Sequence, residues 1–136
     1  MDEHVEVAPK ILGRVRGVCL GLPESYEEQA WLGTRWRIRK RTFAHVLTIE
    51  AGSPPAYARA AAHEGPICVM TLRSQSPELE ALRHAGRPFF APVWREDEVG
   101  LVLDANTDWQ EVAELITDSY CAQAPRTLAA RVSRPK

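Results

Sequence analysis

Residues 35–49 read RWRIRKRTFAHVLTI, and this stretch decides the expected fold. Trp36 and Ile38 alternate with arginines, which is typical of a strand with one buried face and one charged face. Residues 42–49 are rich in β-branched and aromatic side chains, which favour a second strand. We therefore predict an antiparallel hairpin that turns near residues 39–41.

The same stretch carries an excess of positive charge. Five of the seven residues from Arg35 to Arg41 are basic, namely Arg35, Arg37, Arg39, Lys40 and Arg41, and no acid occurs between Gln29 and Ile49. Guanidinium groups suit phosphate contacts, so we expect weak, sequence-tolerant binding of DNA by this hairpin. An alternative stays open, in which Trp36 and Ile38 belong to the core and the arginines form a solvated edge that discourages strand pairing.

The whole chain has the composition of one globular domain. It contains 136 residues, of which 45% are hydrophobic and 26% are charged, and its net charge is −1, so the basic stretch is a local feature. The cysteines, Cys19, Cys68 and Cys121, are far apart in apolar surroundings, which indicates buried thiols in a reducing compartment. The N-terminus is acidic and no apolar run is long enough to span a bilayer, so we expect a cytoplasmic protein without a membrane partner.

The remaining elements follow from helical periodicity, caps and breakers. We expect a loose arm over residues 1–8, a single domain over residues 9–132 and a tail over residues 133–136. Helices are predicted at residues 9–22, 56–63, 76–86, 107–124 and 125–132, and further strands at residues 30–32, 67–72, 89–90 and 99–103. This order predicts an α+β fold of two layers, in which helices pack on one face of an antiparallel sheet of about five strands.

Several segments together resemble the MmcQ/YjbR family of small bacterial proteins. They are residues 15–24, which end in Leu-Pro-Glu, residues 41–44, residues 99–104, which end in Leu-Asp, and the Ser-Tyr and Ala-Pro-Arg motifs of residues 119–131. The resemblance extends from about residue 9 to residue 131. It implies a two-layer fold related to secretion chaperones, and DNA binding through two paired β-hairpins, called a double wing.

The chain departs from that family pattern at both expected wings. Asp97 and Glu98 stand where the family often has Gly-Trp, and Arg39 and Lys40 stand where it often has a glycine turn. The first wing is therefore more basic and the second more acidic than the resemblance implies, which argues against a symmetric grip on DNA. The acidic turn at residues 96–98 is either solvated, a weak cation site, or a contact for the basic hairpin of a second molecule.

Other candidate residues point to binding rather than catalysis. Arg126 and Arg131 either extend the basic surface or belong to a solvated C-terminal region. The four histidines lack metal-site spacing and no catalytic constellation can be assembled, so we expect no enzyme activity, no metal and no cofactor. The alternative function is an adaptor that binds a protein or peptide on the sheet. Tyr120 is expected to be buried, with a hydroxyl partner near residues 124–125.

Overall fold

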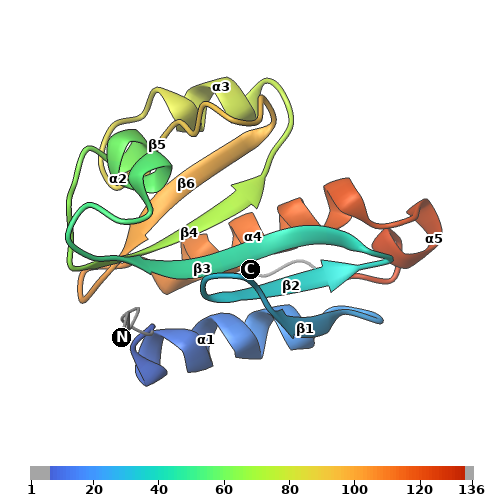
Figure 1. The fold of residues 1–136 in the computed structure, drawn as a ribbon. Helices are drawn as coiled ribbons and strands as arrows, with labels where there is room; N and C mark the ends of the chain where they lie inside the picture. The colour runs from blue at the N-terminus through green and yellow to red at the C-terminus, as the bar shows by residue number, and fades with distance from the viewer. Residues whose placement is uncertain (1–6, 134–136) are drawn as a thin grey trace.

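The computed structural model describes residues 7–133, which form an open antiparallel sheet flanked by helices (Figure 1). The sheet has six strands in the order β1-β2-β3-β4-β6-β5. Their bounds are β1 (Tyr26–Gln29), β2 (Thr34–Ile38), β3 (Arg41–Ile49), β4 (Ile67–Arg73), β5 (Phe89–Phe90) and β6 (Glu98–Leu103). The predicted two-layer α+β fold is confirmed, with six strands in place of about five.

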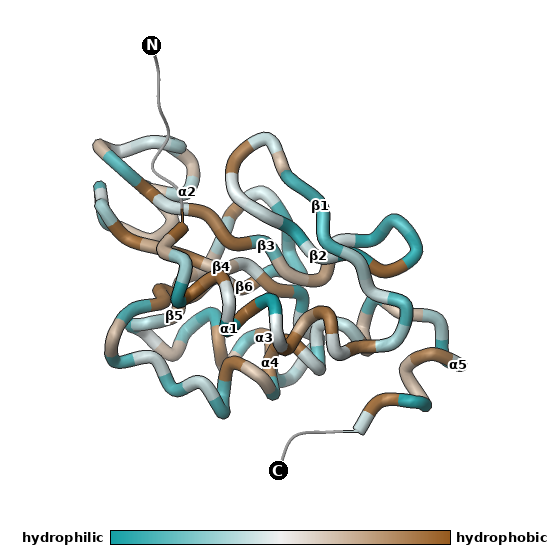
Figure 2. Tube along the Cα trace, turned by 90° about the horizontal axis from the view of Figure 1, so that it is seen from below, coloured by the Kyte–Doolittle hydropathy of each residue, from teal (hydrophilic) through white to brown (hydrophobic). Residues whose placement is uncertain are grey.

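The sixth strand is β1, to whose residues the sequence analysis assigned no helix or strand. The predicted strand at residues 30–32 is instead the turn between β1 and β2. Apolar and polar residues do not alternate in β1. Its glutamates instead pair with cations of neighbouring elements, Glu27 with Arg16 and Glu28 with Arg35. Figure 2 shows this edge of the sheet in hydrophilic colours. Cross-strand ion pairs stabilise such a polar edge strand, but its sequence looks like a loop.

The two long helices cover one face of the sheet. Helices α1 (Pro9–Leu20) and α4 (Trp109–Gln123) pack on the side chains that β2, β3, β4 and β6 direct to that face, and together they form the main core. Trp36 lies at its centre with 0% of its surface exposed, and its indole Nε1 donates to Glu27 Oε1 at 2.9 Å. The alternative in which Trp36 and Ile38 are core residues is therefore confirmed.

The opposite face of the sheet is only partly covered. The short helix α2 (Pro55–Ala61) packs there on Leu47, Val69 and Val102 in a second, smaller core, whereas the sequence predicted helices on one face alone. Helix α3 (Glu78–Arg83) lies beside β5 and β6. The part of this face around His45 stays open, and a cavity lies over it.

Loops and termini hold the layers together. Helix α4 is capped by Asp108, whose side chain accepts from Glu111 N at 3.1 Å. The last helix is α5 (Arg126–Ala129).

Val7 is buried in the main core, so the end of the predicted loose arm is ordered by packing, while residues 1–6 and 134–136 lie outside the described residues. Across residues 7–133, no helix has the length and apolar character needed to cross a bilayer.

Candidate functional site

The basic hairpin turns where the sequence predicted. Arg39 and Lys40 form its two-residue tip with φ angles of 50° and 67°, so both adopt the left-handed conformation. A two-residue connection of this kind matches the right-handed twist of the flanking strands, and its usual residues are Asn and Gly. Both side chains are exposed. The turn therefore presents two cations to solvent at the end of the sheet.

The arginines of β2 lie on the open face and share one carboxylate. Arg35 Nε donates to Glu28 Oε1 at 2.6 Å, and Arg37 Nη1 lies 3.4 Å from the same oxygen. Arg37 also donates to the carbonyl oxygen of Lys40. The hydrogen bond from Arg35 is the largest cause that lowers the pKa of Glu28. Glu28 therefore offsets part of the positive charge of Arg35 and Arg37.

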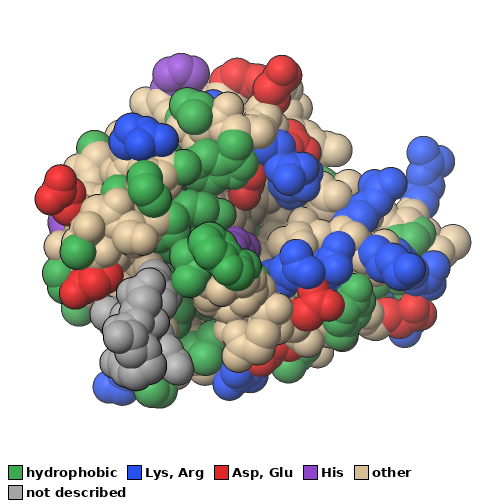
Figure 3. Space-filling view, viewed as in Figure 1, with side chains coloured by type: hydrophobic (Ala, Val, Ile, Leu, Met, Phe, Trp, Pro, Cys, Tyr) green, Lys and Arg blue, Asp and Glu red, His purple; other side chains and the backbone are tan. Residues whose placement is uncertain are grey.

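The C-terminal arginines join the hairpin instead of lying on the far side. Arg39 Nη2 lies 3.0 Å from Glu24 Oε1, and Arg131 Nη1 lies 3.9 Å from Glu24 Oε2. Arg126 lies on α5, at the same end of the molecule as the β2–β3 turn (Figure 1). We call this surface the basic end; it consists of Arg35, Arg37, Arg39, Lys40, Arg41, Arg126 and Arg131. Figure 3 shows Lys and Arg side chains gathered there, beside a few carboxylates.

The acidic turn is mostly used inside the molecule. Asp97 Oδ2 accepts from Arg73 Nη1 at 2.8 Å. Glu98 is 8% exposed, and its Oε1 accepts from Trp94 Nε1 at 3.0 Å and lies 3.5 Å from Arg95 Nε. Two of the three carboxylates are thus engaged by their own chain, and Glu96 alone is exposed. No group of His, Cys, Asp or Glu side chains within the described part of the chain is placed to hold a metal ion.

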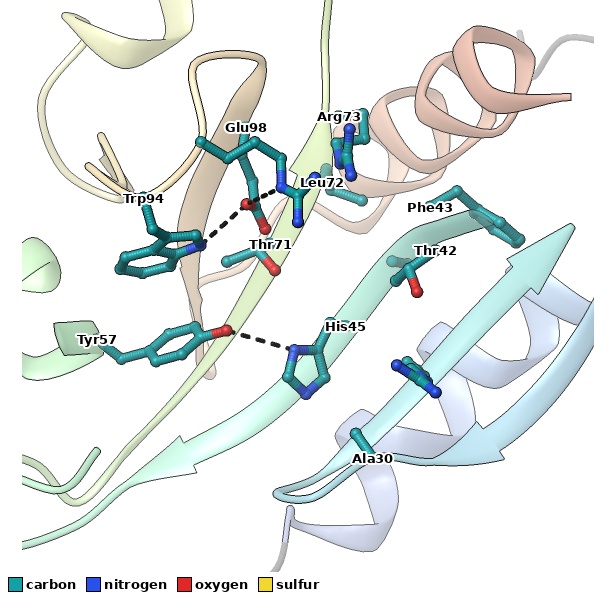
Figure 4. A pocket seen from close by; sticks show the side chains of 13 residues that line it. Ala30, Thr42, Phe43, His45, Tyr57, Thr71, Leu72, Arg73, Trp94 and Glu98 are labelled. Atoms are coloured by element: carbon teal, nitrogen blue, oxygen red, sulfur yellow. Dashed lines mark hydrogen bonds and ion pairs between the residues drawn. The ribbon is translucent and has the colours of Figure 1, made fainter. Parts of the chain in front are cut away.

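A cavity of about 290 Å³ lies on the open face, and we call it the sheet pocket. Its floor includes His45 of β3 and Thr71 of β4, which are register partners (Figure 4). One wall is aromatic: the rings of Tyr57 and Trp94 are 4.6 Å apart at a 48° angle. The sequence analysis did not find this pocket, because its residues come from α2, four strands, the β1–β2 turn and the segment before β6.

The hydrogen bonds of His45 fix which nitrogen faces the pocket. Its Nε2 lies 2.7 Å from the carbonyl oxygen of Leu32, so Nε2 carries the proton and donates. Nδ1 is then an acceptor, 3.5 Å from the hydroxyl of Tyr57. Burial lowers the pKa of His45, which keeps the imidazole neutral near pH 7. Burial also raises the pKa of Tyr57 to about 12, so its hydroxyl keeps its proton.

The fold and these two features define a class: a small two-layer α+β protein with an open antiparallel sheet, a basic end and a pocket on the uncovered face. The YjbR family model matches residues 20–122. The chain therefore belongs to the YjbR family, which confirms the resemblance seen in its motifs.

Solved structures agree with this assignment. A Deinococcus radiodurans protein with the DUF419 domain is 20% identical, with a TM-score of 0.58 over 82% of this chain and 76% of its own. A Pseudomonas syringae protein, determined as a structural-genomics target, is 14% identical, with a TM-score of 0.62 over 85% of this chain and 99% of its own. At these identities the likeness establishes the fold alone. No curated protein sequence matches the chain significantly.

Proposed function

We propose that this protein binds nucleic acid through phosphate contacts at the basic end, with little dependence on base sequence. The observation that carries the proposal is the approach of Arg39 and Arg131 to one carboxylate, Glu24. It supports a single positive surface built from two segments that are far apart in the chain. The seven cations of the basic end have two carboxylates among their ion-pair partners, Glu24 and Glu28. The remaining positive charge favours a polyanion.

The contact we propose is one-sided, unlike a symmetric grip by two wings. The second hairpin has no matching excess of positive charge at its tip, because Asp97 pairs with Arg73 and Glu98 pairs with Arg95. Trp36 is buried, so it contributes no stacking to this surface. Phosphate contacts fix position and orientation but carry no sequence information, which is why we expect sequence-tolerant binding.

Charge reversal at two exposed residues of the basic end should weaken binding. The double variant Arg41→Glu/Arg126→Glu is expected to lower affinity for a labelled 20-base-pair duplex by about tenfold or more at 50 mM salt. The slope of log K against log salt should fall in magnitude by roughly 2, since each lost phosphate contact contributes about 1. Fluorescence anisotropy at several salt concentrations measures both quantities.

A matched control separates local from overall charge. Lys10 on α1 and Arg59 on α2 are exposed and lie outside the basic end, so Lys10→Glu/Arg59→Glu makes the same change in net charge. This control should retain most of the wild-type affinity. Equal losses in both double variants would contradict a localised surface. Wild-type protein that shows no binding at 50 mM salt would remove the proposal altogether.

Neutralising Glu28 should strengthen binding. The Glu28→Gln variant frees Arg35 and Arg37 from their shared carboxylate. Two cations are then no longer offset by a neighbouring carboxylate, so we expect affinity for the same duplex to rise roughly two- to fivefold. The control is Glu114→Gln on the exposed side of α4, which changes net charge equally and should leave affinity within about twofold. A gain of equal size in both variants would attribute the effect to net charge alone.

An adaptor that binds a polypeptide on the sheet ranks second. Its support is the uncovered face of the sheet, but that face is lined largely by ion-paired side chains and holds a pocket of only about 290 Å³. In either case we propose a binding role without catalysis or cofactor. A cytoplasmic location remains part of the proposal and is compatible with Cys19 and Cys68, which are buried and form no disulfide.

A further inference from the structure

We propose that the sheet pocket takes one unpaired nucleobase that carries an exocyclic amino group, and that the chain therefore prefers single strands to duplex. This inference rests on the proposed function, since the phosphates flanking that base would lie on the basic end. Four observations carry it: the position of the pocket, its charge balance, its shape and the direction of its hydrogen-bonding groups.

The pocket is continuous with the basic end. Arg35 belongs to the basic end and also lines the pocket, and it is the register partner of His45 on the pocket floor. Figure 3 shows a histidine side chain in a hollow between hydrophobic side chains and the gathered Lys and Arg residues. A strand held by its phosphates over β2 and β3 would therefore have a base within reach of the hollow.

Charge balance favours a neutral polar group over a free anion. The pocket contains three arginines, and each has a carboxylate partner: Arg35 pairs with Glu28, Arg73 with Asp97, and Arg95 with Glu98. An anion entering the pocket would have to compete with these carboxylates at close range. A nucleobase is neutral and planar, and it needs hydrogen-bond partners instead of a compensating charge.

The shape of the pocket fits one base. A volume of about 290 Å³ corresponds to about ten water molecules, which is enough for a single planar ring system. The indole of Trp94 is 38% exposed and lies against Tyr57, so the wall has a ring face available for stacking. Stacking on aromatic side chains is the usual way in which proteins hold unpaired bases.

Two acceptors, His45 and Glu98, line the pocket beside its arginines. His45 Nδ1 is an acceptor because Nε2 donates to the carbonyl oxygen of Leu32, and a bound amino group would replace the long contact of 3.5 Å between Nδ1 and the Tyr57 hydroxyl. Glu98 directs its carboxylate toward Thr71 and the pocket, and Trp94 and Arg95 contact only its Oε1 (Figure 4). Carboxylates in protein–DNA contacts accept from the amino group of cytosine. Cytosine therefore fits these acceptors better than thymine, which has a carbonyl at the same position and only one ring N–H.

The test compares labelled dC10, labelled dT10 and a 10-base-pair duplex in one anisotropy series at equal salt and pH 7.5. Wild-type protein is expected to bind dC10 at least threefold more tightly than dT10. Trp94→Ala should weaken dC10 binding by about fivefold or more, the loss typical of one stacked base, and leave duplex binding within twofold. Glu98→Gln should remove the preference for dC10 over dT10.

A spectroscopic readout does not depend on any variant's stability. Titration of wild-type protein with cytidine 5′-monophosphate should shift the indole N–H resonance of Trp94 in a ¹H–¹⁵N spectrum, and thymidine 5′-monophosphate should shift it less. Duplex binding that persists with no effect of Trp94→Ala on dC10 and no indole shift would overturn the base pocket while leaving phosphate binding intact. If wild-type protein binds none of the three oligonucleotides, both the proposed function and the proposed base pocket are refuted.

Discussion

Replacement of Trp36 by alanine is expected to lower the free energy of unfolding by about 3–5 kcal/mol, the range measured for large aromatic side chains removed from cores. Trp36 is fully buried on the face of β2 that α1 and α4 cover. Its Nε1 also donates to Glu27, which accepts from Arg16 on α1. The change therefore leaves a large cavity and deprives a carboxylate of one donor. Urea denaturation followed by circular dichroism measures the loss.

Trp31 supplies the matched control. It is 93% exposed in the β1–β2 turn, so Trp31→Ala should change stability by no more than about 0.5 kcal/mol. A Trp36→Ala variant as stable as Trp31→Ala would contradict a buried position for Trp36.

Replacement of Ser119 by alanine is expected to cost about 2–4 kcal/mol, although only one oxygen atom is removed. Ser119 on α4 has 0% of its surface exposed. Its hydroxyl donates to the carbonyl oxygen of Phe43 at 2.6 Å and accepts from the backbone N–H of Arg73 at 2.8 Å. Each buried backbone group left without a partner costs about 1–3 kcal/mol. The two backbone groups lie at a bulge in the β2–β3 pairing and at the end of β4, so no ladder bond replaces Ser119.

Ser76 is the control for this variant. It is exposed before α3, where its hydroxyl donates only to Glu80, so Ser76→Ala should stay within about 0.5 kcal/mol of wild type. Thermal and urea denaturation should agree on the difference between the two variants. A loss below about 1 kcal/mol for Ser119→Ala would show that water or another group satisfies the Phe43 carbonyl and the Arg73 N–H.

The basic hairpin could be predicted because its signals are local. Alternation of Trp36 and Ile38 with arginines sets the buried face of β2, and the short basic run between two apolar segments sets the turn. Strand β1 could not be predicted, because what makes it a strand is pairing with β2 and ion pairs to Arg16 and Arg35. Of its own four residues, Tyr26–Gln29, only Tyr26 is of a type enriched in strands.

Tyr120 has one property that the sequence predicts, its burial, and one that it does not, the partner of its hydroxyl. Its burial follows from helical periodicity and is confirmed, with 0% of its surface exposed. The expected hydroxyl partner near residues 124–125 was wrong, because the hydroxyl donates to the carbonyl oxygen of Pro23 at 2.6 Å. That partner lies 97 residues away in the sequence, in the loop after α1. A periodic pattern predicts which side of a helix is buried, but it contains no information on the atoms of the neighbouring element.

Sequence alone thus determined the family, the fold class, the local elements with strong periodicity and the stretch that carries the positive charge. These properties depend on residues within a few positions of one another, where backbone geometry fixes which side chains share a face. Tertiary structure alone decided that Glu24 and Glu28 offset part of the charge of the basic end, and that Arg131 belongs to it. It alone also brought the side chains of one pocket together, namely His45, Tyr57, Trp94 and Glu98. Those arrangements depend on strand order and register, which bring together side chains from distant segments.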